Sequence, residues 1–124
     1  MQQRIRVLIA DDSSLARAML REILQTQPDI EVVGEACNGQ QAVDMAQTLS
    51  PQLITMDLEM PVMGGRDVMR LIRENKNYNH INIIVHTNMS NDNMEHELEK
   101  AGANAIIGKV NMLKLGEAIN ELII

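Results

Sequence analysis

The stretch Ile5-Arg-Val-Leu-Ile-Ala10, followed at once by Asp11-Asp12-Ser13-Ser14, decides the fold class. A short apolar run that gives way to acidic and hydroxyl residues predicts a buried strand that ends at a surface. Apolar residues then recur at helical spacing, at Ala16, Met19, Leu20, Ile23 and Leu24. The chain therefore begins with a strand, a break and a helix with one apolar face.

The same order recurs along the chain. The expected strands are Ile5–Ala10, Ile30–Ala36, Leu53–Met56, Ile81–Val85 and Ala103–Gly108. Each is followed by an apolar stripe at helical spacing. The fourth helix is expected from about Ser90 to Lys100 with Ser90 as its N-cap, and the last carries Met112, Leu115, Ala118, Ile119 and Leu122. This alternation predicts an α/β fold, a doubly wound parallel sheet of five strands with five helices on its two faces.

Composition limits the class of protein. The 124 residues, of which 45% are hydrophobic, suit one domain over residues 1–124. The net charge of −6 and the 1% aromatic content argue against nucleic acid as a partner, because phosphate contacts need a basic face and base stacking needs rings. The apolar runs are too short to cross a membrane, and the single Cys37 cannot form an internal disulfide, so we expect a cytoplasmic domain. The ten methionines either fill the core or line a docking surface.

Reactive side chains stand where the expected strands end. Asp11 and Asp12 follow the first strand, Asp57 the third, Thr87 the fourth and Lys109 the fifth. The carboxyl ends of parallel strands share one edge of a sheet, where ligands bind in this fold class. Three carboxylates repel one another unless a cation lies among them, and hard oxygen ligands suit Mg²⁺. The set points to phosphoryl transfer to a carboxylate, with the metal and the lysine neutralising charge.

Each residue also has an ordinary interpretation. An aspartate at a strand end is often a turn residue or a helix cap, and Lys109 alone reads as a solvated lysine. His80, His86 and His96 lack the spacing of a zinc site. The acidic residues of the fourth helix, Glu95, Glu97 and Glu99, are either its solvated side or a surface for a basic partner. It is the combination of residue types at four of five strand ends that favours a functional site.

Along its whole length the chain resembles the receiver domains of two-component response regulators. The motifs are Val7-Leu-Ile-Ala-Asp-Asp-Ser13, Met56-Asp-Leu-Glu-Met-Pro61 with Gly64, Thr87, and Gly108-Lys109. Ile30-Glu-Val-Val-Gly-Glu-Ala36 also looks like the receiver portion of the CheB methylesterase. The resemblance implies a CheY-like, flavodoxin-like sheet of strand order 2-1-3-4-5 and one receiver domain over residues 1–124.

The resemblance also implies roles for the strand-end residues. Asp57 would accept a phosphoryl group from a histidine kinase or phosphotransfer protein. Asp12, Asp57 and the backbone carbonyl of Glu59 would bind Mg²⁺ directly, and Asp11 would act on it mostly through water. Thr87 would hydrogen-bond the phosphoryl group and Lys109 would pair with it.

The output that the resemblance implies is a conformation. The face formed by the fourth and fifth helices and the fifth strand would change and bind a downstream effector protein, with chemotaxis one pathway left open. The domain would catalyse its own phosphorylation and hydrolysis only, and would not be a metabolic enzyme. Neither nucleic acid nor a membrane is expected as a partner of this domain.

The sequence departs from the family pattern at several positions. Ile106 replaces an aromatic residue that usually reports phosphorylation. Val110 replaces a proline, so the Lys109–Val110 bond is expected to be trans. Asn88 stands where a small residue is usual and Glu59 adds a carboxylate, and we expect these two to set the lifetime of the phosphorylated state.

Two other functions fit the fold class. A flavin-binding electron carrier needs a phosphate-cradling loop after the first strand, which Asp11-Asp12 would oppose, and a ring to sandwich the flavin. A phosphatase of the haloacid dehalogenase type needs Asp-x-Asp after the first strand and usually a cap insertion, whereas the aspartates here are adjacent. Both are therefore disfavoured.

Overall fold

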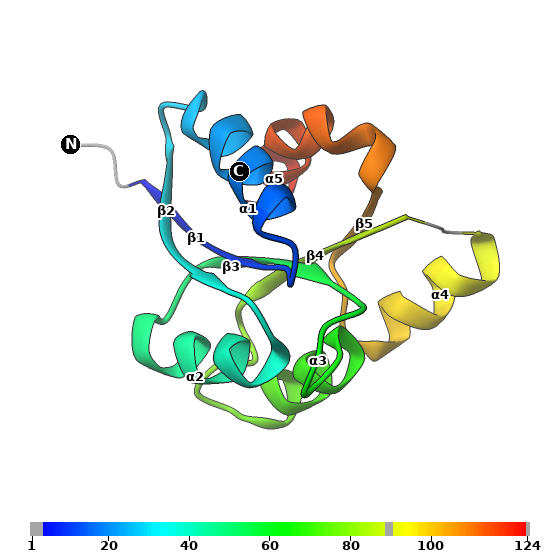
Figure 1. Cartoon of the computed structure of the whole chain (residues 1–124). Coiled ribbons are helices and arrows are strands. Elements are labelled where there is room, and N and C mark those ends of the chain that lie inside the picture. Colours follow the sequence, from blue (N-terminus) through cyan, green and yellow to red (C-terminus); the bar gives the residue numbers. More distant parts are fainter. Residues whose placement is uncertain (1–3, 89–90, 124) are drawn as a thin grey trace.

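A computed structural model describes residues 4–88 and 91–123 of the chain (Figure 1). Its parallel sheet has the strand order β2-β1-β3-β4-β5, which confirms the predicted fold. The strands are β1 (Ile5–Ala10), β2 (Ile30–Ala36), β3 (Leu53–Asp57), β4 (Asn82–Thr87) and β5 (Ala105–Gly108). The helices are α1 (Ser14–Gln25), α2 (Gly39–Leu49), α3 (Gly65–Glu74), α4 (Asp92–Ala101), the 3₁₀ helix η1 (Lys109–Lys114) and α5 (Leu115–Ile123).

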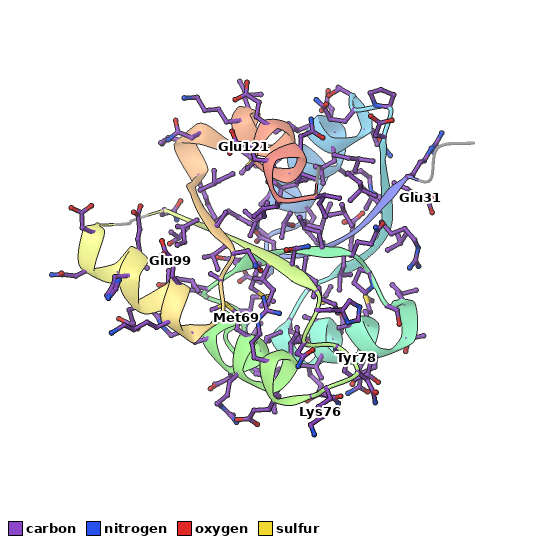
Figure 2. The ribbon with its side chains drawn as sticks, turned by 180° about the vertical axis from the view of Figure 1, so that it is seen from behind. Glu31, Met69, Lys76, Tyr78, Glu99 and Glu121 are labelled. Carbon is purple, nitrogen blue, oxygen red and sulfur yellow. The ribbon has the colours of Figure 1, made fainter. Side chains whose placement is uncertain are left out.

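The sheet is covered on both faces. Figure 1 shows α1 and α5 on one face and α2 and α3 on the other. Alternate residues of β1 enter the two layers: Val7 and Ile9 pack under α1 and α5, and Leu8 and Ala10 pack toward α2 and α3. This two-sided burial is why β1 is a continuous apolar run. Met69 of α3 lies inside the second layer (Figure 2), where it is fully buried and fills core space.

The helix starts follow from side-chain caps. Ser13 accepts a hydrogen bond from the backbone N–H of Ala16 at 3.1 Å and begins α1. The predicted cap of the fourth helix was wrong: Ser90 lies outside the described residues, and Asn91 caps α4 by accepting from the N–H of Met94 at 2.9 Å. An amide oxygen serves a cap as well as a hydroxyl does, so the sequence could not separate the two neighbours.

Two other boundaries differ from prediction. β5 begins at Ala105 and not at Ala103, because the N–H of Ala103 still binds the carbonyl of Leu98 and so belongs to the end of α4. Met112, predicted in the last helix, lies instead in the 3₁₀ helix that precedes it. The 3₁₀ helix η1 precedes α5, and Asn111 within it has non-helical backbone angles. No helix among residues 4–88 and 91–123 is long and apolar enough to cross a membrane.

Arg73, at the end of α3, ties together the amino ends of β4 and β5. Its guanidinium donates hydrogen bonds to the carbonyls of Asn79, Ile81 and Gly102 and to the side-chain oxygen of Asn104, all between 2.7 and 3.0 Å. Burial lowers the pKa of Arg73 from its ordinary value. A planar, five-donor side chain is suited to this position, because it can serve several carbonyls at once.

The loop between β3 and α3 is fixed by close backbone contacts. A Cβ on Gly39 would collide with the carbonyl oxygen of Met63, so α2 can start against this loop only with glycine there. Within the loop, the N–H of Met63 donates to the carbonyl of Pro61 at 2.7 Å, and Val62 has φ of 69°. This is a tight three-residue turn with a β-branched residue in the left-handed region at its centre. This strained backbone conformation raises the free energy of the folded state by about 1–3 kcal/mol.

Candidate functional site

The predicted strand-end residues meet at the carboxyl edge of the sheet. Asp57 and Thr87 are the last residues of β3 and β4, and Asp11 and Lys109 directly follow β1 and β5. Because the strands are parallel and neighbouring, these ends lie side by side. A cavity of about 510 Å³ opens there, lined by Asp12, Asp57, Leu58, Glu59, Arg66, Thr87, Asn88, Met94 and Lys109.

Three carboxylates form the acidic part of the site. Asp11, Asp12 and Asp57 each offer one oxygen, and these oxygens all lie within 4.8 Å of one another. Asp11 is completely buried and Asp57 is 6% exposed, whereas Asp12 is exposed. Like charges at this separation, away from water, raise the free energy of the ionised cluster, so the arrangement favours a bound cation.

The electrostatics of Asp57 follow from its surroundings. Burial and the neighbouring Asp11 raise the pKa of Asp57 to about 6, with a smaller contribution from Asp12. The ammonium of Lys109, with Nζ 3.7 Å from Asp57 Oδ2, and the N–H of Glu59, 3.4 Å from Oδ1, act in the opposite direction on this pKa. Asp57 is thus a carboxylate whose negative charge is not fully compensated by the protein.

Asp11 is held from two sides. Its Oδ1 accepts a hydrogen bond from the N–H of Ser13 at 2.9 Å. Its Oδ2 lies 3.7 Å from Lys109 Nζ and 3.8 Å from His86 Nε2. His86 is 2% exposed, and burial, together with the nearby ammonium of Lys109, lowers its pKa to about 4, although the charge of Asp11 acts against this. The imidazole is therefore neutral at pH 7.

Two residues of the site were missed from the sequence. The spacing of His86 argues only against a zinc site, but its place two residues after Ile84 on a central strand predicts a buried side chain on the same sheet face. Arg66 was not singled out. It lines the cavity from α3 and its Nε donates to Glu97 Oε1 of α4 at 3.1 Å. An exposed arginine in a helix carries no sequence signal for such a role.

Two of the four positions that depart from the family pattern line this cavity. Glu59 and Asn88 are exposed and both line it. Ile106 is half-buried in β5, and Val110 is 92% exposed at the start of η1. The peptide bond between Lys109 and Val110 is trans, as predicted.

The fold and the acidic pocket define a class: a CheY-like α/β domain with an acidic cluster and a lysine at its carboxyl edge. Residues 7–120 match the family model described as the response regulator receiver domain. The chain belongs to this family and is a receiver domain of a two-component system, which confirms the resemblance recognised in the sequence.

Curated proteins similar to this chain are larger than it. A protein-glutamate methylesterase/protein-glutamine glutaminase of Shewanella frigidimarina is 43% identical over 102 residues, which is 82% of this chain and 25% of the relative. A relative of the same description from Methanosarcina acetivorans is 37% identical over 102 residues, 82% of this chain and 28% of the relative. The chain thus spans about a quarter of the length of these relatives.

Solved structures agree with this assignment. The response regulator domain of Thermotoga maritima CheB has a TM-score of 0.82 and 31% identity, covering 97% of this chain and 93% of that one. A CheX–CheY–BeF₃–Mg²⁺ complex from Borrelia burgdorferi has a TM-score of 0.89 at 21% identity, covering 98% and 91%. The second likeness concerns the fold alone.

Proposed function

We propose that Asp57 is the phosphoacceptor of a phosphorelay and that residues 1–124 act as one phosphorylation switch. The observation that carries this proposal is the short distance between unlike groups: Lys109 Nζ lies 3.7 Å from Asp57 Oδ2 at the edge of an open cavity. A carboxylate nucleophile beside a fixed cation is suited to in-line attack on a phosphoryl group, because the cation neutralises charge on the transferred oxygens.

The residues present fit Mg²⁺. The carboxylate oxygen Asp11 Oδ2 is buried without a hydrogen-bond partner among the described residues, beside two further carboxylates. Asp12, Asp57 and the backbone carbonyl of Glu59 would hold the ion directly, and Asp11 would act through water. When bound, Mg²⁺ supplies positive charge to the phosphoryl oxygens and to the acidic cluster.

Thr87 and Lys109 complete the proposed switch. Both line the cavity with Asp57, Thr87 as a hydrogen-bond donor and Lys109 as a cation for the phosphoryl group. The donor would be a histidine kinase or a phosphotransfer protein. The domain would catalyse only its own phosphorylation and hydrolysis, in the cytoplasm, and its output would be a shift between two conformations.

The proposed output surface is the face formed by α4, β5 and α5. A cavity of about 540 Å³ lies on it, lined by Asn88, Glu95, Ile106, Ile107, Gly108, Val110, Asn111, Lys114, Glu117, Ala118 and Glu121. Glu95, Glu117 and Glu121 outnumber Lys114, which favours a basic effector segment. Figure 2 shows Glu121 on α5 and Glu99 on α4. Of the three acidic residues that the sequence analysis noted on α4, only Glu95 lines this cavity. The methylesterase relatives favour a chemotaxis pathway.

The test is phosphorylation by a small donor. The protein is incubated with acetyl phosphate and Mg²⁺, and the intact mass is measured beside that of Asp57→Asn. A gain of one phosphoryl group is expected in the wild type and not in the variant. Asp67→Asn, which changes an exposed carboxylate of α3, is the matched control and should be phosphorylated normally. Phosphorylation of Asp57→Asn to the wild-type extent would overturn the proposal.

A further inference from the structure

His86 is a buried polar side chain that the proposed function does not use. It lies on β4 directly beside Asp57 in the register of the sheet and is 2% exposed. Neither of its ring nitrogens has a hydrogen-bond partner among the described residues. A buried polar group without a partner raises the free energy of the folded state by about 1–3 kcal/mol, so its presence at this position needs a reason.

A carboxylate oxygen of the acidic cluster lies close to this imidazole. Nε2 of His86 lies 3.8 Å from Asp11 Oδ2, an oxygen that is also buried without a hydrogen-bond partner among the described residues. The other oxygen of Asp11 is already bound by the N–H of Ser13. Two unpartnered buried groups, one of which can donate and one of which accepts, thus face each other just beyond hydrogen-bond distance.

Lys109 is shared between two carboxylates. Its Nζ is 3.7 Å from Asp11 Oδ2 and 3.7 Å from Asp57 Oδ2. A phosphoryl group on Asp57 carries more negative charge than the carboxylate and offers three acceptor oxygens, so it draws the ammonium toward itself. Asp11 Oδ2 then loses its nearest cation while remaining completely buried, which is costly unless another donor replaces it.

We propose that His86 is a positioning residue for Asp11: its Nε2–H donates a hydrogen bond to Asp11 Oδ2 when Lys109 turns to the phosphoryl group. This inference rests on the proposed function. The hydrogen bond would keep Asp11 in the orientation that the metal site requires in the phosphorylated state. In the resting state Lys109 Nζ and His86 Nε2 both lie close to Asp11 Oδ2, at 3.7 and 3.8 Å.

The test measures binding of Mg²⁺ and beryllofluoride, a phosphoryl mimic, to the full chain by isothermal titration calorimetry. His86→Leu removes the donor at similar volume, and we expect at least about tenfold weaker binding of beryllofluoride, as is typical for a lost partner of a metal-site carboxylate. His86→Gln retains an N–H donor and should remain within about threefold of the wild type. Thr55→Val, at another buried and unpartnered side chain, is the matched control and should bind normally.

A second readout uses the wild type alone and so does not depend on the folding of a variant. Nitrogen NMR of the His86 ring should show a neutral imidazole protonated at Nε2, with the Nε2–H proton shifting downfield when beryllofluoride is added. A ring protonated at Nδ1 in the mimic-bound state would overturn the inference, as would equal binding by the wild type and His86→Leu. Weak binding by His86→Gln, equal to that by His86→Leu, would also overturn it.

The two proposals fail in different ways. If the wild type binds neither Mg²⁺ nor beryllofluoride, the proposed function is wrong and the role of His86 is wrong with it. If the wild type binds both and is phosphorylated, and His86→Leu behaves in the same way, only the role of His86 is wrong.

Discussion

The two ends of the sheet differ in how well their charged side chains are compensated by neighbouring groups. At the amino end, the single cation of Arg73 meets only neutral oxygen acceptors, and five hydrogen bonds satisfy it. At the carboxyl end, Asp11, Asp12 and Asp57 form an acidic cluster in which the Lys109 ammonium lies 3.7 Å from Asp11 and from Asp57. Buried atoms of Asp11 and His86 there lack hydrogen-bond partners among the described residues. The first arrangement stabilises the fold, whereas the second holds a repulsion between carboxylates that a bound cation can relieve.

The largest expected effect on stability comes from removing the hydrogen bonds of Arg73 at the amino end of the sheet. Arg73→Met leaves the carbonyls of Asn79, Ile81 and Gly102 without this donor, while Asn104 Oδ1 keeps the N–H of Ile83, and we expect the free energy of unfolding to fall by about 3 kcal/mol. Urea unfolding measures it. Arg70→Met, an exposed arginine on the same helix, is the control and should change stability by no more than about 0.5 kcal/mol. Equal effects of the two variants would remove the contrast between the ends of the sheet.

Removing the negative charge of Asp57 at the carboxyl end should, in contrast, increase the stability of the folded protein. Because the pKa of Asp57 is raised to about 6 in the folded protein, its ionised form opposes folding, and stability falls as the pH rises from about 4 to above 6. Asp57→Asn should therefore be more stable than the metal-free wild type at pH 7, by about 2 kcal/mol. Urea unfolding in a chelator measures the difference, which should nearly vanish at pH 4. A variant less stable than the wild type at pH 7 would contradict this account.

Metal should relieve the same repulsion. At a Mg²⁺ concentration ten times its Kd, mass action stabilises the folded protein by about 1.4 kcal/mol. Thermal unfolding with and without Mg²⁺ measures this gain. It should be reduced in Asp12→Asn and kept in Asp67→Asn, whose carboxylate lies outside the cluster. An equal gain in Asp12→Asn and the wild type would place the bound ion elsewhere.

The smallest expected effect concerns the rim of the cavity. Glu59 and Asn88 are exposed and line it, so they stand where water reaches Asp57. Replacing either with alanine should change the rate of dephosphorylation at least twofold, with little effect on stability. The decay of phosphorylated protein after removal of the donor measures the rate. Rates within twofold of the wild type for both variants would show that these residues do not set the lifetime.

The sequence was sufficient for the fold and for the residues that gather at the carboxyl end. Strand and helix periodicity are local, and parallel strands bring their carboxyl ends to one edge, so Asp11, Asp57, Thr87 and Lys109 could be placed together without coordinates. The helix cap at Asn91 and the 3₁₀ helix before α5 could not be placed, because they depend on competition between neighbouring residues of similar propensity.

The contacts within the site were beyond sequence reasoning. The approach of His86 to Asp11 joins residues 75 positions apart through the register of three strands, β1, β3 and β4. The pairing of Arg66 with Glu97 depends on how two helices pack. Neither the His86–Asp11 contact nor the Arg66–Glu97 contact produces a pattern in the sequence from which it could be predicted.

Because Gly39 has no Cβ, the start of α2 can contact the loop that follows Asp57. Met63 sits directly on the first turn of α2, so the segment that follows Asp57 leans on a second helix as well as on its own sheet. Any displacement of that segment must push α2 or pull away from it. This contact connects the loop beside the acidic pocket to α2, on the face of the sheet opposite α1 and α5.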